Sequence, residues 1–366
     1  MTMLCRTRVT VLCLLATLTA APALADSGAA HRAAQTVPVK LGTSGGNVKD
    51  ISKAFCCSGT LGALVTKNGK SYILSNNHVL ARSGAAVVGE NVSQPGLIDS
   101  GCRPKTIVAG FSEAASLGGS NVDAALAEVR PGSVDAAGVI LDVGIPANAP
   151  GSPAVGMTVA KSGRTTGLTC GDVSSVLTDV SVQYQKGCNS GKKFVITYVD
   201  QMIVGSSTFS AGGDSGSLIV NASTAQPVAL LYAGSSSTTI ANPIQDVTAA
   251  LGVSFVGGTT HTVSCPAAAA TATASANTPP AQAIEHAAVV KNRHAPGLLR
   301  QPGVQGVGVG VSDNDSSQPA IVLYVIEGVE HAPLPTQLDG IPTRIVSTDR
   351  FRASGWNEPS ESSCSH

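Results

Sequence analysis

The chain has 366 residues, of which 43% are hydrophobic and only 13% are charged, and its 23 basic residues equal its 23 acidic residues in number. A balanced charge offers no general attraction for polyanions, so neither a nucleic acid nor an anionic membrane is expected as a partner. After the first 25 residues, no segment is long and apolar enough to predict a membrane span.

The first 25 residues resemble a secretory signal peptide. Arg6 and Arg8 are basic, residues 9–18 are apolar, and the segment ends at Ala23-Leu24-Ala25. We expect cleavage before Asp26 and an extracellular or periplasmic protein, with an uncleaved anchor as the alternative. Cleavage removes two basic residues and no acidic ones, which leaves 21 positive against 23 negative side chains, or a net charge of −2.

An N-terminal extension (26–54) precedes a region, 55–258, that has the pattern of an all-β domain. Short β-branched and apolar runs alternate there with Gly, Ser, Asn and Pro, which is typical of a sandwich or barrel. A short helix is expected at 244–251. The predicted strands are 62–65, 71–74, 106–109, 122–129, 158–161, 194–198, 217–220 and 227–232.

His78 is the only histidine between Ala33 and Thr260. The apolar run Tyr72-Ile73-Leu74 predicts a strand, and the polar residues after it place His78 at the strand's end, where scaffolds commonly present reactive groups. His78 is therefore the candidate general base, with a surface or structural histidine as the alternative.

Asp123 is the best candidate for a carboxylate that orients His78. It lies in Asn121-Val122-Asp123-Ala124-Ala125-Leu126, among small apolar neighbours. Burying a carboxylate there is costly unless it is paired, and the His78 Nδ1 atom is a suitable partner. The competing acids lie mostly in polar or turn-like contexts: Glu90, Asp99, Glu113, Glu128, Asp135, Asp142, Asp172, Asp179 and Asp200.

Ser215 lies in the turn Gly212-Gly213-Asp214-Ser215-Gly216-Ser217. Glycine on both sides allows a tight turn, in which the amides of Gly213 and Ser215 can point at the position of an oxyanion. We therefore predict Ser215 as the nucleophile, with an ordinary glycine-serine turn as the alternative.

The order His78, Asp123, Ser215, with gaps of 45 and 92 residues, resembles that of chymotrypsin-like serine peptidases. The likeness covers about residues 55–256, and Lys161-Ser162-Gly163-Arg164-Thr165-Thr166-Gly167 is similar to a segment of the secreted bacterial branch. It implies two six-stranded antiparallel β-barrels, with His78 and Asp123 on the first and Ser215 on the second. It also implies hydrolysis of peptide bonds through an acyl-enzyme, with proteins or peptides as substrates.

The same resemblance implies a role for Asp214, which in animal members pairs with a new amino terminus. This chain has no Ile-Val-Gly-Gly start before the first barrel, so an internal cation is expected instead. Lys161 and Arg164 are the two candidates, with a solvated turn residue as the alternative for Arg164. Activation by insertion of a new terminus is not expected.

The substrate pocket that the resemblance implies is uncharged. Phe209 lies six residues before Ser215, where an acid would select basic side chains, and the backbone of Tyr232, Ala233 and Gly234 is expected to pair with an extended substrate. No histidine follows Ser215 before His261, which argues against a glutamate-selective pocket built on an imidazole. A pocket for medium-sized apolar side chains is the prediction.

Seven cysteines remain after removal of the signal peptide, and an oxidising compartment favours disulfides. We expect Cys170 to pair with Cys188 across a hairpin, and Cys102 to pair with Cys56 or Cys57. The odd number leaves at least one thiol unassigned. The spacing does not fit a zinc site, and neither a metal nor a cofactor is expected.

A linker (259–282) precedes a small α+β domain (283–356) and a tail (357–366). Residues 284–300 have helical spacing, although Pro296 should end or break the helix, and strands are expected at 303–311, 320–326 and 343–346. The glycines of 306–310 do not fit a dinucleotide fingerprint. The domain should be separable from the peptidase, which is expected to be a monomer.

Two other functions fit the sequence. One is a quality-control peptidase with a peptide-binding C-terminal domain, and the other is a non-catalytic binding protein on a peptidase scaffold. The C-terminal part of the chain lacks the full strand and helix set of such a peptide-binding domain, which weighs against the first alternative. All three triad residue types are present, which weighs against the second. A secreted serine endopeptidase is therefore the prediction.

Overall fold

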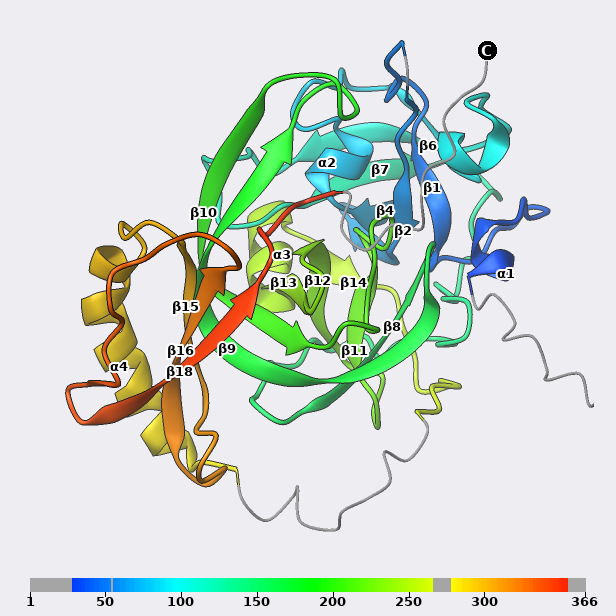
Figure 1. Ribbon diagram of the computed structural model, residues 1–366. Coiled ribbons are helices and arrows are strands. Elements are labelled where there is room, and N and C mark those ends of the chain that lie inside the picture. The colour runs from blue at the N-terminus through cyan, green and yellow to red at the C-terminus, as the bar shows by residue number, and fades with distance from the viewer. Residues whose placement is uncertain (1–27, 54, 266–277, 355–366) are drawn as a thin grey trace, which may run out of the picture.

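The computed structural model describes residues 28–53, 55–265 and 278–354. Two sheets lie side by side and a C-terminal unit adjoins the second (Figure 1). The predicted signal peptide falls outside the described residues. Within them, no helix has the length and apolar character needed to cross a membrane.

The first sheet has eight strands in the order β14-β3-β4-β7-β6-β5-β1-β2. It carries the short helix α2 (Asn77–Leu80) directly after β4, and α1 (Ala29–Arg32) and η1 (Leu97–Ser100) lie outside it. Its strands are β1 (Thr43–Asn47), β2 (Gly59–Leu61), β3 (Ala63–Lys67), β4 (Lys70–Ser75), β5 (Asn91–Gln94), β6 (Thr106–Ala114), β7 (Ala125–Val129) and β14 (Ser254–Phe255).

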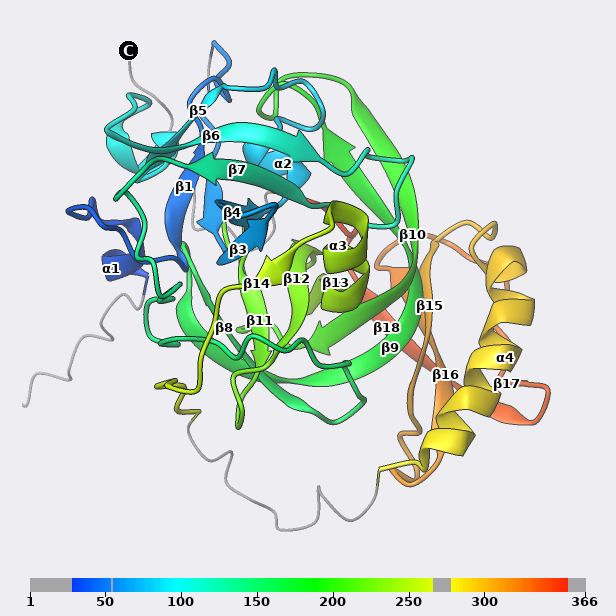
Figure 2. The ribbon, with the colours of Figure 1, turned by 180° about the vertical axis from the view of Figure 1, so that it is seen from behind.

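The second sheet contains a closed ring of six strands, because β9 pairs with both β8 and β10. The helix α3 (Ile244–Leu251) has the bounds predicted from the sequence. It packs against β12 and β13 (Figure 2). The strands are β8 (Thr158–Gly163), β9 (Gly167–Gln185), β10 (Lys193–Gly205), β11 (Leu218–Asn221), β12 (Pro227–Gly234) and β13 (Thr238–Pro243). The predicted all-β, double-barrel class is confirmed.

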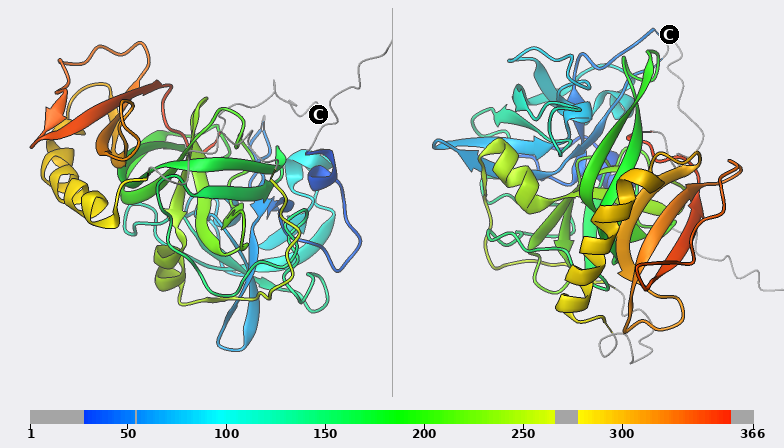
Figure 3. Two further views of the ribbon diagram at one scale, coloured as in Figure 1. Left: turned by 90° about the horizontal axis from the view of Figure 1, so that it is seen from below. Right: turned by 90° about the vertical axis from the view of Figure 1, so that its left-hand side faces the viewer.

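The C-terminal unit is α+β, as predicted. It contains α4 (Ala281–Leu298), β15 (Val304–Val311), β16 (Pro319–Ile326), β17 (Gln337–Leu338) and β18 (Ile341–Thr348). The helix covers β15 and β16 (Figure 3). The helix continues two residues beyond Pro296 and ends at Leu298, so the proline lies in its last turn.

The C-terminal unit extends the second sheet. Strand β15 pairs antiparallel with β9, with Gly306 opposite Val180. The buried Lys291 ammonium of α4 lies 2.7 Å from a carboxylate oxygen of Asp179 and 3.1 Å from one of Asp200. The strand pairing and the ion pairs both hold the C-terminal unit against the second barrel. The sequence had predicted that this unit is separable.

Residues 259–265 of the predicted linker are also held in place. The Thr262 amide donates a 2.8 Å hydrogen bond to the Val143 carbonyl, and Cys265 forms a disulfide with Cys170. The double-barrel part of the chain therefore includes residues as far as Cys265. Residues 266–277 lie outside the described residues.

The predicted disulfide between Cys170 and Cys188 is wrong. The described disulfides are Cys56–Cys102, Cys57–Cys188 and Cys170–Cys265. Cys170 lies near the start of the 19-residue strand β9, whereas Cys188 follows its end. Because a strand rises about 3.3 Å per residue, the two thiols are out of reach of each other. Cys102 does pair with one of its two predicted partners, and Cys364 lies outside the described residues.

Candidate active site

His78 and Asp123 form a closely bound pair. The His78 Nδ1 atom lies 2.6 Å from Asp123 Oδ2, and the His78 backbone amide donates to Asp123 Oδ1 over 3.3 Å. Asp123 is fully buried, whereas the imidazole borders a cavity. The carboxylate therefore fixes one ring nitrogen, and the other, Nε2, has no hydrogen-bond partner among the described residues.

The backbone of Asp123 is held by two asparagines. Asn76, just before α2, donates its side-chain amide to the Asp123 carbonyl over 2.7 Å, and the Asp123 amide donates to the Asn242 side chain over 3.0 Å. These side-chain contacts replace strand pairing, which explains why β7 begins at Ala125 and not at the predicted residue 122.

A buried tyrosine supplies a second donor to the Asp123 carboxylate. The Tyr184 hydroxyl of β9 lies 2.8 Å from Asp123 Oδ2 and 2.8 Å from the Tyr198 hydroxyl of β10. Burial, together with the nearby Asp123 charge, raises the pKa of Tyr184 well above its ordinary value. Tyr184 therefore stays protonated and donates to the carboxylate.

The serine turn has the backbone geometry that glycine permits. Gly213 and Gly216 both have φ near +93°, a region that other residues rarely adopt. A Cβ atom on Gly216 would lie 2.4 Å from the Thr60 carbonyl oxygen, so the turn has no room for a side chain there. Ser215 lies between these glycines, is 3% exposed and borders the same cavity as His78.

Asp214 is fixed by backbone amides and by a buried lysine. It accepts hydrogen bonds from the amides of Thr165 at 2.8 Å and Ala211 at 3.0 Å. The Lys161 ammonium lies 3.5 Å from its Oδ2 atom, and both side chains are fully buried. Burial lowers the pKa of Lys161, and the Asp214 charge opposes that shift.

Arg164, the other predicted cation for Asp214, pairs with a different acid. Its Nε and Nη2 atoms lie 2.6 and 2.8 Å from the two carboxylate oxygens of Asp99. Both side chains are nearly buried, so Arg164 is neither the partner of Asp214 nor a solvated turn residue. The Lys161 side chain reaches Asp214 because it points inward from β8, whereas Arg164 lies in the turn after that strand.

The cavity beside His78 and Ser215 has a volume of about 560 Å³. Charged side chains border this cavity, whereas the substrate pocket predicted from the sequence is uncharged. One of them is Asp50, which is 9% exposed, and burial raises its pKa to about 6 while the charges of Arg82 and His78 oppose the shift. The charged lining residues are Arg32, Asp50, Arg82, Asp99 and Arg164.

The predicted substrate-pocket residues do not border this cavity. Phe209, Tyr232 and Ala233 are fully buried, and Phe209 packs in the core of the second barrel beside Val204 and Ile219. The aromatic ring thus packs in the barrel core and does not reach this cavity. Gly234 differs from them, because its backbone pairs with residues near the end of the described chain.

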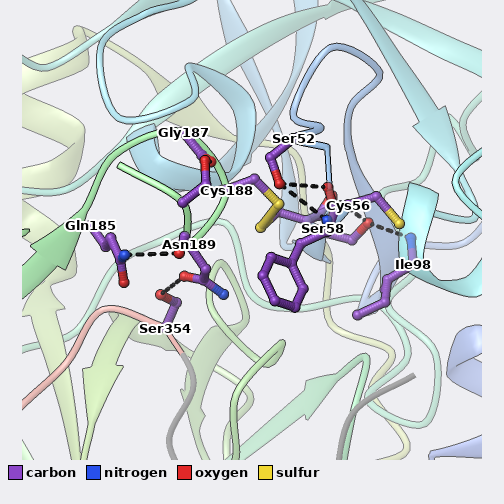
Figure 4. The surroundings of a disulfide bond; sticks show 12 residues. Ser52, Cys56, Ser58, Ile98, Gln185, Gly187, Cys188, Asn189 and Ser354 are labelled. Atoms are coloured by element: carbon purple, nitrogen blue, oxygen red, sulfur yellow. Dashed lines mark hydrogen bonds between the residues drawn. A yellow bond between two sulfur atoms is a disulfide. The ribbon is translucent and has the colours of Figure 1, made fainter. Parts of the chain in front are cut away.

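The Cys57–Cys188 disulfide connects the two barrels beside the cavity. Cys188 follows β9 at the tip of the β9–β10 hairpin, and Cys57 precedes β2 of the first sheet. Figure 4 shows Ser354 next to Asn189 at this tip, and the Ser354 hydroxyl lies 3.4 Å from Asn189 Oδ1. The disulfide therefore holds the hairpin tip against the first sheet at the rim of the cavity.

A second histidine–aspartate pair lies outside the cavity lining. His31 Nε2 lies 2.9 Å from Asp142 Oδ2, and His31 Nδ1 lies 2.8 Å from the Gly42 carbonyl. Both ring nitrogens are occupied, so this imidazole has no nitrogen to accept a proton from a serine. Within the described part of the chain, no cluster of three or more potential ligands is arranged to hold a metal ion.

No protein-family model and no curated protein matches the chain. Similar solved structures are serine proteases. A glutamic acid-specific serine protease described as using a histidine triad in substrate binding has 22% identity, a TM-score of 0.43 and coverage of 59% of this chain and 100% of its own. Protease A of Thermobifida fusca has 16% identity and a TM-score of 0.37, and the match covers 56% of this chain and 96% of its own. A Cellulomonas bogoriensis chymotrypsin has 19% identity and a TM-score of 0.39, and the match covers 60% of this chain and 99% of its own. At these identities the likeness concerns the fold alone.

The sequence did not indicate three features of the site. Tyr184, Asp50 and the residues near Arg352 come from segments without a recognisable motif. Tyrosine is rare here, with five in the chain, and three of them (Tyr184, Tyr198 and Tyr232) are buried near Asp123. That scarcity is the one signal that would have drawn attention to Tyr184.

Proposed function

We propose that this chain is a secreted serine endopeptidase that hydrolyses peptide bonds with Ser215, His78 and Asp123. The observation that carries the proposal is the 2.6 Å contact between His78 Nδ1 and Asp123, beside a cavity that Ser215 also borders. A buried carboxylate that fixes one imidazole nitrogen leaves the other to act as a base.

In the proposed reaction, Ser215 Oγ attacks the carbonyl carbon of the substrate while its proton passes to His78 Nε2. Asp123 holds the ring and stabilises its charged form, and the amides of Gly213 and Ser215 bind the oxyanion. His78 then gives the proton to the leaving amine, and water releases the acyl group by the same steps. Lys161 keeps Asp214, and with it the serine turn, in position.

Secretion is part of the proposal. The described residues contain three disulfides, which form and persist in oxidising compartments. Residues 1–25 supply the predicted export signal.

Covalent labelling tests the proposal directly. A fluorophosphonate should phosphonylate the hydroxyl of Ser215 with loss of fluoride, which intact mass and peptide mapping would locate, and Ser215→Ala should not react. Ser217→Ala is the matched control, because this neighbouring serine donates its hydroxyl only to the Asp214 carbonyl in the same turn. Labelling elsewhere, or equal labelling of Ser215→Ala, would exclude the triad. A peptide library then gives the specificity.

A further inference from the structure

Residues 349–354, here called the terminal segment, lie between strands β9 and β12 of the second barrel and reach Ser215. They follow β18, and Figure 1 shows this red part of the chain running from the C-terminal unit toward α2. Arg352 exchanges two main-chain hydrogen bonds of 2.9 Å with Gly234 at the end of β12. On the other side, the Gln183 amide donates to the Phe351 carbonyl at 2.9 Å, and the Ala353 amide donates to Gln183 at 3.1 Å. The segment is therefore an added strand between β9 and β12.

The added strand ends on the proposed nucleophile. Ser215 Oγ donates a hydrogen bond to the Ala353 carbonyl oxygen over 3.2 Å, and Ala353 is only 2% exposed. The serine proton thus points at a peptide carbonyl of the same chain and not at His78 Nε2, which has no partner among the described residues. Ser354 then borders the cavity.

The terminal segment is anchored on both sides. The side chain of Gln305 on β15 donates to the Asp349 carbonyl and accepts from the Phe351 amide, each over 2.9 Å. Asp349 in turn accepts two 2.6 Å hydrogen bonds from the amide and hydroxyl of Ser236, just after β12. Phe351 is fully buried against Tyr324 of β16. This set of contacts fixes both the register and the direction of the segment.

We propose that the terminal segment is a built-in peptide ligand of the cleft that inhibits the full-length chain. This inference rests on the proposed peptidase function. An extended substrate would need the same main-chain groups of Gly234 that Arg352 occupies. Because the segment is tethered, it competes at the high effective concentration of an intramolecular ligand. The Ser215 contact with the Ala353 oxygen also diverts the serine proton from His78.

Proline at position 352 tests the competition in the full-length chain. Arg352→Pro removes the amide that donates to Gly234 and places a ring against that carbonyl, whereas Arg352→Ala keeps the main-chain pairing and removes only an exposed side chain. We expect Arg352→Pro to raise both peptide turnover and the rate of Ser215 labelling by about tenfold or more, as the loss of one or two hydrogen bonds would. Arg352→Ala should match the wild type.

Hydrogen exchange gives a measurement that does not depend on catalysis. In the Ser215→Ala background, the amides of Gly234 and Arg352 should be protected, and the Gly234 protection should be lost with Arg352→Pro while the barrel core stays protected. Rapid exchange of both amides in the parent chain would overturn the proposal. So would equal turnover of all three proteins when Arg352→Pro has lost the Gly234 protection.

Two further outcomes separate this inference from the proposed function. A chain that ends at Ala353 in the wild type but not in Ser215→Ala would make the segment a self-processing site, and would overturn its role as an inhibitor. In the other outcome, no variant hydrolyses peptides or reacts with the fluorophosphonate, although the Gly234 amide is protected from exchange in the parent chain and not in Arg352→Pro. The peptidase function then fails, and the segment is a structural strand.

Discussion

Two fully buried carboxylates, Asp123 and Asp214, lie near the same serine and have different kinds of partner. Asp123 accepts from the His78 ring and the Tyr184 hydroxyl, whereas Asp214 accepts from backbone amides and pairs with Lys161. The second nitrogen of the imidazole has no hydrogen-bond partner among the described residues, whereas the amides and the lysine are held against Asp214. Under the proposed function, this comparison assigns Asp123 to the reaction and Asp214 to the shape of the serine turn.

The largest expected effect tests the reactive half of the comparison. Asp123→Asn should lower turnover by about 10⁴-fold, the size seen when the carboxylate of such a triad becomes an amide, because the imidazole is then held in the wrong tautomer. The melting temperature should change little. Steady-state rates on one peptide substrate and a thermal melt provide the measurement.

Asp142→Asn is the matched control for this variant, because Asp142 also binds a histidine, His31, at 2.9 Å but outside the cavity lining. Its turnover should equal that of the wild type. A loss of less than tenfold in Asp123→Asn would remove Asp123 from the triad.

The structural half of the comparison is tested at Lys161. Lys161→Met leaves Asp214 buried without its cation, and removing one partner of a buried pair costs about 3 kcal/mol or more in the free energy of unfolding. Urea unfolding measures this loss. The double variant Lys161→Met/Asp214→Asn should recover most of the stability, because no unpaired charge remains. Equal stability of the single variant and the wild type would contradict the assignment of Lys161.

Asp50 adds a third buried carboxylate, whose side chain lies near Arg82, His78 and Glu90. Burial raises its pKa to about 6 from an ordinary value of 3.8, so its stabilising contribution is complete below pH 4 and is lost as the pH rises through about 6. Relative to the wild type, Asp50→Asn should therefore gain about 2 kcal/mol in unfolding free energy between pH 4 and pH 8.

Chemical unfolding at several pH values measures this difference. Glu285→Gln is the control, because Glu285 is exposed on α4 and its neutralisation should give no such pH dependence. A difference between Asp50→Asn and the wild type that is the same at pH 4 and pH 8 would show that burial does not perturb the Asp50 carboxyl.

Local sequence was sufficient to propose the three triad residues and the all-β class. His78 was indicated by the scarcity of histidine between residues 33 and 260 and by the strand before it, whereas the signals for Ser215, its glycines, and for Asp123, its apolar neighbours, lie within a few residues of the side chain concerned. The helix at Ile244–Leu251 was likewise predictable from its own residues.

Features that join distant segments were not predictable. The Cys57–Cys188 disulfide spans 131 residues, and cysteine spacing alone does not determine connectivity. Strand β9 runs from Gly167 to Gln185 through several Ser, Thr and Asp residues that also suit turns, so its length was not apparent. The contact of Ala353 with Ser215 depends on how β15 joins β9, a pairing that no local pattern encodes.

The smallest expected effect concerns the second donor to Asp123. Tyr184→Phe keeps the ring, which stacks on Phe194 with centroids 5.5 Å apart, and removes only the hydroxyl that lies 2.8 Å from Asp123 Oδ2. A hydrogen bond to a charged group contributes about 1.5 to 3 kcal/mol. If about half of that acts on the orientation of His78 in the transition state, turnover falls by roughly 3- to 12-fold. Tyr324→Phe is the control, since it removes another buried hydroxyl, 2.8 Å from Ser175 on β9, away from the triad. It should lower stability and leave turnover unchanged. Equal turnover losses in the two variants would mean that Tyr184 acts through the fold and not through Asp123.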